Sequence, residues 1–346
     1  MPETSRVLTP EALMARIERI PRVPLAHLPT PLDAAPRLTA ALGGPQIYIK
    51  RDDMTGLAFG GNKTRQLEYL FAELQARGAD CIVAGAYTQS NWCRQITAAA
   101  CKQGLQASLV LLHGEKGPAL QGNLLLDHLL GADVAVVELD SMEHLPPMLE
   151  ERAAALRKAG RRPYIVDPFD IATLSLSAIG YVRAFVELDR QLSEAGVNAD
   201  AIYVAGANMT PAGLMVGARA LGRVTRVVGI APIEWEEDRA VDIARIASAT
   251  AARLDLDPRF APAEVTCETG YIGERYGVVT PEGRAALRLV AETEGVFLDP
   301  VYSSKAMAGL IDHIRTGRVG GDETVVFLHT GGTPAIFAYA DDLMKA

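Results

Sequence analysis

Cysteine and histidine are scarce in this chain, which has four cysteines and six histidines in 346 residues. Neither type is spaced like a set of metal ligands, and no two histidines form a His-x-x-x-His pair. Cys93 and Cys101 share a helical pattern of small residues, so we expect both to be core residues rather than a disulfide or zinc pair. The sequence therefore predicts no metal site.

Basic charge is also in short supply. Lys and Arg number 34 against 42 Asp and Glu, which gives a net charge of −8 and a pI of about 5.4. A nucleic-acid-binding protein needs a basic face, so we expect no nucleic-acid partner. No apolar run of membrane-spanning length stands out, so we expect no membrane partner. Met1 to Arg6 lack the basic-then-apolar order of a secretory signal, which makes the cytoplasm the expected location.

The chain has the balance of a globular protein, with 49% hydrophobic and 22% charged residues. Continuous apolar runs alternate with helical patterns, which predicts βαβ units and strands buried on both faces. The expected strands are 46–50, 81–84, 107–112, 133–137, 164–166, 201–205, 226–230 and 324–328. The clearest expected helices are 10–20, 64–77, 92–103 and 174–195. We predict an α/β fold of open, twisted, mostly parallel sheets with flanking helices.

A lone lysine, Lys63, follows a Gly-Gly-Asn turn and precedes an apolar-periodic run. Gly60 and Gly61 allow a tight bend, and Asn62 is a good residue to cap a helix. Lys63 would then lie in the first helical turn, where the positive end of the helix dipole disfavours an ammonium. Most such lysines are merely solvated. A lysine that is easily neutral is also what Schiff-base chemistry needs.

The run from Lys50 to Arg65 resembles the cofactor-lysine region of the family of D-cysteine desulfhydrases and 1-aminocyclopropane-1-carboxylate (ACC) deaminases. These are pyridoxal 5'-phosphate (PLP) enzymes of the tryptophan-synthase-β-like fold. The resemblance implies that Lys63 carries PLP, with Asn62 beside it. It also implies two domains: a larger PLP-binding domain of residues 1–60 plus 176–346, and a smaller inserted α/β domain of residues 61–175. Family members are usually homodimers, so a homodimer is expected.

The segment Gln89-Ser90-Asn91 follows an expected strand and opens an expected helix. A helix N-terminus with hydroxyl and amide donors is a good carboxylate site, although Ser-Asn before a helix is most often only a cap. The resemblance implies that Gln89, Ser90 and Asn91 hold the substrate carboxylate, with Ser90 near the reacting atoms. Family members usually have His or Gln at the next position. Here it is Trp92, which would reshape the substrate pocket.

Another strand-to-helix turn runs from Gly206 to Gly213. Such turns can hold a phosphate through backbone N–H groups and the helix dipole. The family usually has a Gly- and Ser-rich phosphate loop here. This chain keeps Gly206 and Thr210, but has Asn208 and Met209 where glycines are common. Asn tolerates a left-handed backbone better than Met does, so the loop could follow a different path. The expected phosphate-loop residues are Gly206, Ala207, Asn208, Met209 and Thr210.

The resemblance also implies active-site roles for two tyrosines and one threonine. Tyr276 and Tyr302 would line the site, where a phenol can move a proton or orient a leaving group. Thr330, at the carboxyl end of an expected strand, would face the pyridine nitrogen of PLP. We expect Lys63, Ser90, Tyr276 and Tyr302 to be catalytic.

Two positions favour one reaction within the family. ACC deaminases have Glu directly after the tyrosine equivalent to Tyr302, and Leu before the Gly-Gly pair. This chain has Ser303 and Thr330 there, as D-cysteine desulfhydrases have small hydroxyl residues. A hydroxyl facing the pyridine nitrogen makes PLP a weaker electron sink. A weaker sink suffices for eliminating a thiolate, which is a good leaving group, whereas opening a cyclopropane ring benefits from a stronger one. Ser303 is therefore also a candidate substrate-binding residue.

The predicted function is β-elimination from a small β-substituted amino acid, with D-cysteine giving pyruvate, ammonia and sulfide. The alternatives are a lyase for another three-carbon amino acid such as cysteate, and an ACC deaminase. A non-enzymatic alternative is a PLP-binding protein without turnover.

Overall fold

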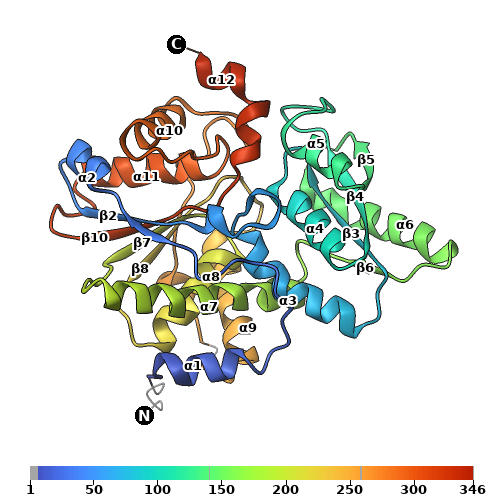
Figure 1. Cartoon of the computed structure of the whole chain (residues 1–346), viewed down its shortest axis with the longest axis horizontal. Helices are drawn as coiled ribbons and strands as arrows, with labels where there is room; N and C mark the ends of the chain where they lie inside the picture. Colours follow the sequence, from blue (N-terminus) through green and yellow to red (C-terminus); the bar gives the residue numbers. More distant parts are fainter. Residues whose placement is uncertain (1–6, 140, 258, 346) are drawn as a thin grey trace.

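The computed structural model describes residues 7–139, 141–257 and 259–345, and it contains two β-sheets with helices on both faces of each (Figure 1). The larger sheet has the strand order β1-β2-β10-β7-β8-β9, and the smaller has the order β5-β4-β3-β6. Every pairing is parallel except that of β1 with β2. The predicted α/β class with mostly parallel sheets is confirmed.

The strands have the following bounds: β1 Leu32–Ala34, β2 Gln46–Lys50, β3 Cys81–Tyr87, β4 Gln106–Leu112, β5 Asp133–Val137, β6 Pro163–Ile165, β7 Ala201–Ala205, β8 Arg226–Ile230, β9 Thr266–Glu268 and β10 Thr324–Leu328. All eight expected strands are present, with their ends moved by at most three residues. The sequence analysis missed β1 and β9. Both are three-residue edge strands that lie partly exposed, so neither has a continuous apolar run.

The helices have the following bounds: α1 Pro10–Ile17, α2 Pro36–Leu42, α3 Lys63–Ala76, α4 Asn91–Lys102, α5 Gly122–Leu129, α6 Leu145–Lys158, α7 Ile171–Glu194, α8 Met209–Ala220, α9 Arg239–Arg253, α10 Pro281–Glu294, α11 Ser303–Arg315 and α12 Ala340–Met344. One face of the larger sheet packs against α1, α7, α8 and α9, and the other against α2, α10 and α11 (Figure 1). In the smaller sheet, α3 and α4 cover one face and α6 the other.

Helix α7 corrects one expectation. By length and composition it is apolar enough to cross a membrane, although no such segment was expected. However, 78% of its apolar window is buried inside the protein, because α3, α8 and α9 pack around it. Its apolar character is therefore that of a central core helix.

The strands of the smaller sheet, β3 to β6, all lie within the segment 61–175 that was predicted to form the inserted domain. The predicted boundary at 175/176 falls inside α7, which continues without a break across it. The two-domain division itself stays a prediction.

One of the two cysteines expected in the core is not there. Cys93 is buried between α4 and the smaller sheet. Cys101, two turns further along α4, is exposed, and its Sγ contacts the carbonyl oxygen of Leu130. The small-residue pattern predicts both cysteines in the core, but the end of α4 reaches solvent.

Candidate active site

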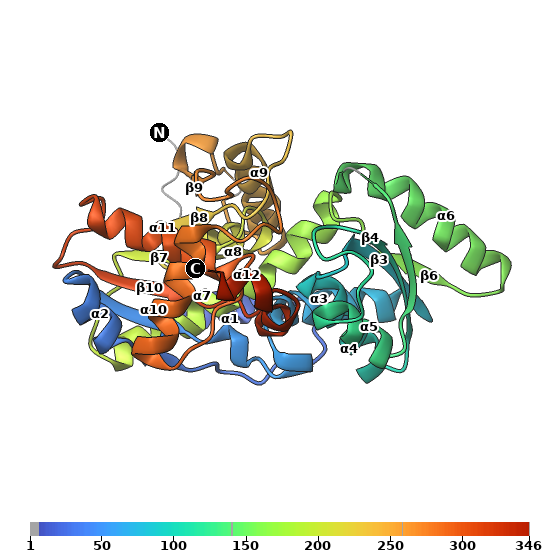
Figure 2. The ribbon, with the colours of Figure 1, turned by 90° about the horizontal axis from the view of Figure 1, so that it is seen from above.

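A pocket opens between the carboxyl ends of β3 and β6 in the smaller sheet and those of β7 and β8 in the larger sheet. Helix α3 lies at the junction of the two sheets (Figures 1 and 2). The carboxyl ends of parallel strands are where ligands of α/β proteins usually bind. The cavity has a volume of about 150 Å³. The predicted site residues that line it are Asn62, Lys63, Ser90, Trp92, Gly206, Ala207, Asn208, Met209, Thr210, Tyr276 and Tyr302.

Lys63 lies in the first turn of α3, as predicted, and is the first residue of this helix. Its Nζ lies 5.3 Å from the centre of the Tyr302 ring. Loss of water around the ammonium lowers the pKa of Lys63 from 10.5 to about 8. The Asp299 carboxylate opposes this shift, and the Arg94 guanidinium adds to it. The sequence argument relied on the helix dipole, but burial is the larger cause. At pH 7 Lys63 is therefore still mostly an ammonium, but its neutral fraction is far larger than that of a solvated lysine.

Asn62 does not cap α3 with its side chain, contrary to expectation. Its backbone is already helical, with φ −57° and ψ −29°, whereas a capping residue is usually extended. Its Nδ2 instead donates to Thr210 Oγ1 at 3.1 Å. Asn62 thus joins α3 to the loop before α8.

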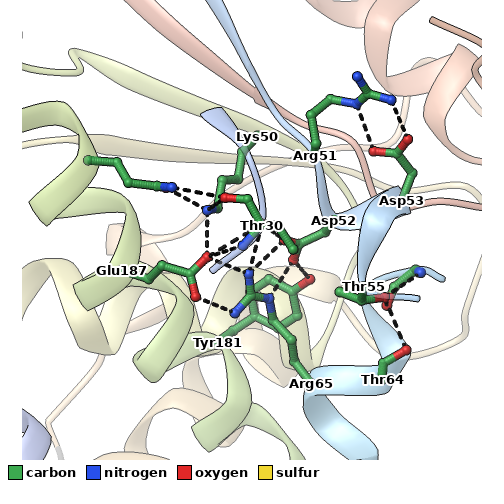
Figure 3. A network of polar contacts seen from close by, with 12 residues as sticks. Thr30, Lys50, Arg51, Asp52, Asp53, Thr55, Thr64, Arg65, Tyr181 and Glu187 are labelled. Carbon is green, nitrogen blue, oxygen red and sulfur yellow. Dashed lines mark hydrogen bonds and ion pairs between the residues drawn. The ribbon is translucent and has the colours of Figure 1, made fainter. Parts of the chain in front are cut away.

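A buried network of ion pairs anchors the start of α3 behind Lys63 (Figure 3). Arg65 donates through Nε and Nη2 to the two oxygens of Asp52, at 2.9 and 2.8 Å, and also contacts both oxygens of Glu187. Lys50 donates to Glu187 at 2.6 Å, and the Tyr181 hydroxyl donates to Asp52 at 2.6 Å. These residues come from β2, α3, α7 and the turn after β2, so the network ties four segments together.

The chain just before Lys63 is held in an unusual conformation. Ala58 and Phe59 have positive φ values of 43° and 68°, which are costly for residues other than glycine. Arg94 Nη2 donates to the Gly60 carbonyl at 2.8 Å. Gly61 has φ 128°, which favours glycine, and a Cβ atom there would lie 3.1 Å from the Thr330 carbonyl oxygen and 2.6 Å from Gln95 Nε2. This constrained turn fixes where α3 begins.

The loop from Gly206 to Thr210 reaches α8 without any left-handed residue. Asn208 has φ −154° and ψ −113°, which is neither extended nor helical, and its Oδ1 accepts a hydrogen bond from the N–H of Met209, the first residue of α8. Met209 has the helical conformation of α8, so neither substitution places a side chain in the left-handed region. Thr210 Oγ1 accepts hydrogen bonds from Asn62 and from Gln66, at 3.1 and 3.0 Å. Its own hydrogen therefore remains free to donate into the pocket.

The predicted carboxylate segment is only partly exposed to the pocket. Ser90 caps α4, where its Oγ accepts from Cys93 N–H at 3.2 Å, and its hydroxyl hydrogen is left to donate. Gln89 and Asn91 do not line the pocket; both bond to Asn123 on α5. Trp92, the next residue along, lines the pocket. The helix N-terminus of α4 is present as predicted, while the carboxylate-binding roles stay predictions.

Three tyrosines lie together above Lys63. The hydroxyls of Tyr276 and Tyr302 are 2.5 Å apart, and the ring of Tyr87 stacks on Tyr276 with centres 4.6 Å apart. Burial raises the pKa of both Tyr276 and Tyr302 above the usual value, because a phenolate would lose its water. Both phenols therefore stay protonated. One hydroxyl donates to the other, so the pair has one hydrogen left to donate to a substrate.

Ser303 and Thr330 lie close behind the pocket wall rather than on its surface. Ser303 Oγ donates to Asp299 Oδ1 at 2.6 Å, and both residues are fully buried. Asp299 also accepts from the N–H of Tyr302 at 2.9 Å, so it fixes the backbone that carries this tyrosine. The Thr330 carbonyl accepts from Asn62 N–H at 3.0 Å.

Several lining or supporting residues were not singled out from the sequence. Gln66 lies one turn after Asn62, and this i, i+4 spacing could have identified a second donor to the same loop. Asp299 precedes a proline and a helix start, which is a signal for a carboxylate that accepts backbone N–H groups. Arg94 and Trp235 carried no local signal, because tertiary packing alone brings them to this place.

The fold and the site define an α/β protein that presents a partly neutral lysine and a helix N-terminus to one pocket. The sequence matches the family described as "Pyridoxal-phosphate dependent enzyme" over residues 23–331. This chain belongs to that family of PLP-dependent enzymes.

Relatives and solved structures agree with this assignment. The chain is 39% identical over 332 residues to the 1-aminocyclopropane-1-carboxylate deaminase of Burkholderia ambifaria, covering 94% of this chain and 98% of the relative. It is 37% identical over 330 residues to the D-cysteine desulfhydrase of Klebsiella pneumoniae, with the same coverage. A crystal structure of an ACC deaminase homologue superposes with a TM-score of 0.88 at 36% identity, covering 96% of this chain and 98% of that one. Threonine deaminase isoform 2 from Solanum lycopersicum, at 16% identity, covers 99% of this chain and 95% of its own, and its TM-score of 0.67 shows a shared fold.

The residues present fit the cofactor. Lys63 is partly neutral, as a lysine must be to react with an aldehyde. The N-terminus of α8 and the free hydrogen of Thr210 face the pocket and suit a phosphate. A Cβ atom at Gly206 would meet only ordinary contacts, the nearest at 3.5 Å, so packing does not demand glycine there. The glycine instead leaves the backbone open toward the pocket.

Proposed function

We propose that this chain is a lyase that removes the β-substituent of a small amino acid, acting most readily on D-cysteine. The observation that carries the proposal is the pair of hydroxyl residues Ser303 and Thr330, at the positions where the ACC deaminase pattern has Glu and Leu. Ser303 already donates to Asp299, and Asp299 accepts four hydrogen bonds from the residues around it and from Ser303. This carboxylate is therefore occupied in holding the Tyr302 backbone.

When bound, PLP withdraws electrons from the α-carbon of an amino acid and so makes the α-proton acidic. Lys63, with its pKa of about 8, can accept that proton in its neutral form. The substrate carboxylate would lie at the N-terminus of α4, where the Ser90 hydroxyl can donate to it. Tyr302 and Tyr276 share a hydrogen bond, and the hydroxyl that accepts it can orient the departing group by donating its own hydrogen.

The test is release of a 2-oxo acid by purified, PLP-loaded protein, with the visible absorbance recorded alongside. Pyruvate is measured from D-cysteine, L-cysteine, β-chloro-D-alanine and cysteate, and 2-oxobutyrate from ACC. Pyruvate from D-cysteine or β-chloro-D-alanine, without 2-oxobutyrate from ACC, is the expected result. A PLP absorbance band with no product from any of the five would contradict the proposal and leave a protein that binds the cofactor without turnover.

ACC deamination is the second candidate, because relatives with that name are as similar to this chain as the desulfhydrases are. Formation of 2-oxobutyrate from ACC at a rate above that of pyruvate from D-cysteine would favour it. The double variant Ser303→Glu with Thr330→Leu separates the two candidates. If the wild type is a desulfhydrase, this variant should gain activity on ACC. If the wild type already prefers ACC, the variant should change little.

The expected assembly and location complete the proposal. We propose a cytoplasmic homodimer that takes a small amino acid as its substrate and has no nucleic-acid or membrane partner. The net charge of −8 supports the lack of a nucleic-acid partner. Light scattering after size-exclusion chromatography checks the assembly, and a mass of about 37 kDa rather than twice that value would contradict the dimer.

A further inference from the structure

The segment that carries Tyr276 has no regular secondary structure to hold it. It comprises residues 269–280, between β9 and α10, and consists of turns and bends. Gly273 and Gly277, on either side of Tyr276, both have positive φ values, of 79° and 84°. The Tyr276 hydroxyl nevertheless lies 2.5 Å from that of Tyr302. Contacts with other elements must therefore fix the position of Tyr276.

One face of α11 makes contacts of this kind. Lys305, Gly309 and Asp312 are spaced by four and three residues, so they lie in a row along the helix. Lys305 Nζ donates to the Ile272 carbonyl at 2.6 Å. The Tyr271 hydroxyl donates to Asp312 Oδ2 at 2.5 Å. Between these two bonds, a Cβ atom at Gly309 would lie 3.2 Å from the Tyr271 ring, so glycine lets the ring approach the helix closely. The start of the segment is therefore docked on α11.

The same helix also fixes Tyr302, which directly precedes it. The N–H of Tyr302 donates to the Asp299 carboxylate at 2.9 Å, which holds this residue at the N-terminus of α11. Tyr276 is only four residues from Ile272, so a shift of Ile272 would move Tyr276 relative to Tyr302. One helix thus determines the positions of both tyrosines, one at its end and the other through its side.

Lys305 is the charged and buried anchor of this arrangement. Its side chain is fully buried, and the bond to Ile272 is the only hydrogen bond that its ammonium makes to the residues that the structure describes. Burial of the ammonium is costly and lowers the pKa of Lys305 to about 8. In return, a charge-assisted hydrogen bond away from water holds the carbonyl firmly. The pair of Arg275 with Glu115 also contacts the segment, but it is exposed and therefore weaker.

We propose, resting on the β-elimination function above, that Lys305 is a positioning residue for that reaction. Its ammonium holds the Ile272 carbonyl against α11 and so sets the Tyr276 hydroxyl against that of Tyr302. The tyrosine pair can then donate its one remaining hydrogen to the departing group. Lys305 does not line the pocket, so it acts through Tyr276 rather than on the substrate.

The first test is a double-mutant cycle on kcat for pyruvate release from D-cysteine, with PLP in excess. Lys305→Met removes the donor at nearly constant side-chain length. It should lower kcat at least ~10-fold and change KM less than ~2-fold, because Tyr276 acts on the departing group rather than on binding. In a Tyr276→Phe background the same change should lower kcat less than ~2-fold, because no hydroxyl is left to position. Lys158→Met, at an exposed lysine of α6, is the control and should change neither value.

Two results of this cycle would overturn the proposal. One is a kcat of Lys305→Met equal to that of the wild type. The other is an equal loss from Lys305→Met with and without the Tyr276 hydroxyl, which would mean that Lys305 supports the fold as a whole rather than the tyrosine.

A second cycle, by urea denaturation of the cofactor-free protein, needs no turnover. Tyr276→Phe breaks the hydroxyl pair and should lower the urea midpoint of the wild type. In the Lys305→Met background it should lower the midpoint less than about half as much, because the pair is already separated. Equal shifts in both backgrounds would contradict the proposal. A wild type that releases no pyruvate would overturn the β-elimination function, and this cycle would still decide whether Lys305 positions Tyr276.

Tyr271→Phe tests the role of α11 if Lys305→Met does not fold. This variant keeps the ring against Gly309 and removes only the hydrogen bond to Asp312. It should lower kcat ~2- to 5-fold, the value of one neutral hydrogen bond, and should have no effect in the Tyr276→Phe background. The same loss in both backgrounds would show that α11 does not position Tyr276.

Discussion

Lys63 and Arg65 lie two residues apart on α3, Arg65 buried and Lys63 partly buried, and their surroundings shift their pKa values in opposite directions. Arg65 meets the carboxylates of Asp52 and Glu187, which outweigh the cost of burial and raise the pKa of Arg65 well above its usual value. Lys63 has no hydrogen bond or ion pair to any residue that the structure describes, and burial lowers its pKa to about 8. Within one turn, α3 therefore carries Arg65, a member of the buried ion-pair network, and Lys63, which is available for chemistry. We call the network of Lys50, Asp52, Arg65 and Glu187 the clasp.

The comparison shows how stability and reactivity are divided over neighbouring positions. Asp52, Arg65, Glu187 and Lys50 carry two negative and two positive charges, so the clasp is neutral as a whole (Figure 3). The clasp can fix the start of α3 because each of its charged groups pairs with a group of opposite charge. The pocket instead retains an unsatisfied cation, which costs stability and is available to the cofactor.

The largest expected effect is loss of catalysis when Lys63 is removed. Lys63→Met should lower pyruvate release about 10⁴-fold, because it removes both the group that holds PLP and the proposed proton acceptor. The assay uses β-chloro-D-alanine with PLP in excess, and far-UV circular dichroism checks that the variant folds. Activity near that of the wild type would contradict a catalytic role for Lys63.

Breaking the clasp should destabilise the protein without touching the reacting atoms. Arg65→Met leaves the Asp52 carboxylate buried without its bidentate partner, and should lower the free energy of unfolding by about 3–5 kcal/mol. Urea denaturation of the cofactor-free protein measures this change. Arg157→Met, which breaks an exposed pair with Glu150, is the control and should leave the urea midpoint nearly unchanged. Equal effects from both substitutions would mean that the clasp adds nothing to stability.

Lys63→Met should raise the free energy of unfolding of the cofactor-free protein, whereas Arg65→Met lowers it. Below pH 8 the folded protein carries a Lys63 ammonium at a site that disfavours it, so its removal should stabilise the protein at pH 7 by up to about 3 kcal/mol. The gain should shrink as pH rises from 8 toward 10.5, because Lys63 loses its proton in the folded state first. The measurement is urea denaturation of wild type and variant at pH 7 and pH 9.5. A destabilised Lys63→Met at pH 7 would show that Lys63 is paired after all.

The smallest effect concerns the loop before α8. Gln66→Leu removes one of the two donors to Thr210 Oγ1 and should weaken PLP binding by ~2- to 10-fold, the value of one hydrogen bond. Equilibrium dialysis of PLP measures it. Gln75→Leu, on the exposed part of the same helix, serves as the control. A variant that binds PLP as tightly as the wild type would show that Asn62 alone positions Thr210.

Local sequence signals predicted the position of Lys63 in α3 but not the partners of Arg65. The Gly-Gly-Asn-Lys turn placed Lys63 in the first helical turn, because glycines and helix periodicity are local properties. The clasp could not be foreseen, since Arg65 and Glu187 are 122 residues apart and meet only through the packing of α3 on α7. Gly180 is needed at that crossing, where a Cβ atom would lie 2.4 Å from the Arg65 carbonyl oxygen. The reversed role of Asn62, which binds Thr210 rather than capping α3, is a tertiary effect of the same kind.

The measurement that tests the assignment most directly is identification of the lysine that carries PLP. The PLP-loaded protein is treated with borohydride, which fixes the cofactor to the lysine that holds it, and the peptides are then mapped by mass spectrometry. Lys305 is the natural competitor, because it is fully buried and its pKa is also lowered to about 8 by burial. Its Nζ, however, donates to the Ile272 carbonyl at 2.6 Å. The account predicts the added mass on the peptide that contains Lys63, and finding it on Lys305 or on any other lysine would contradict it.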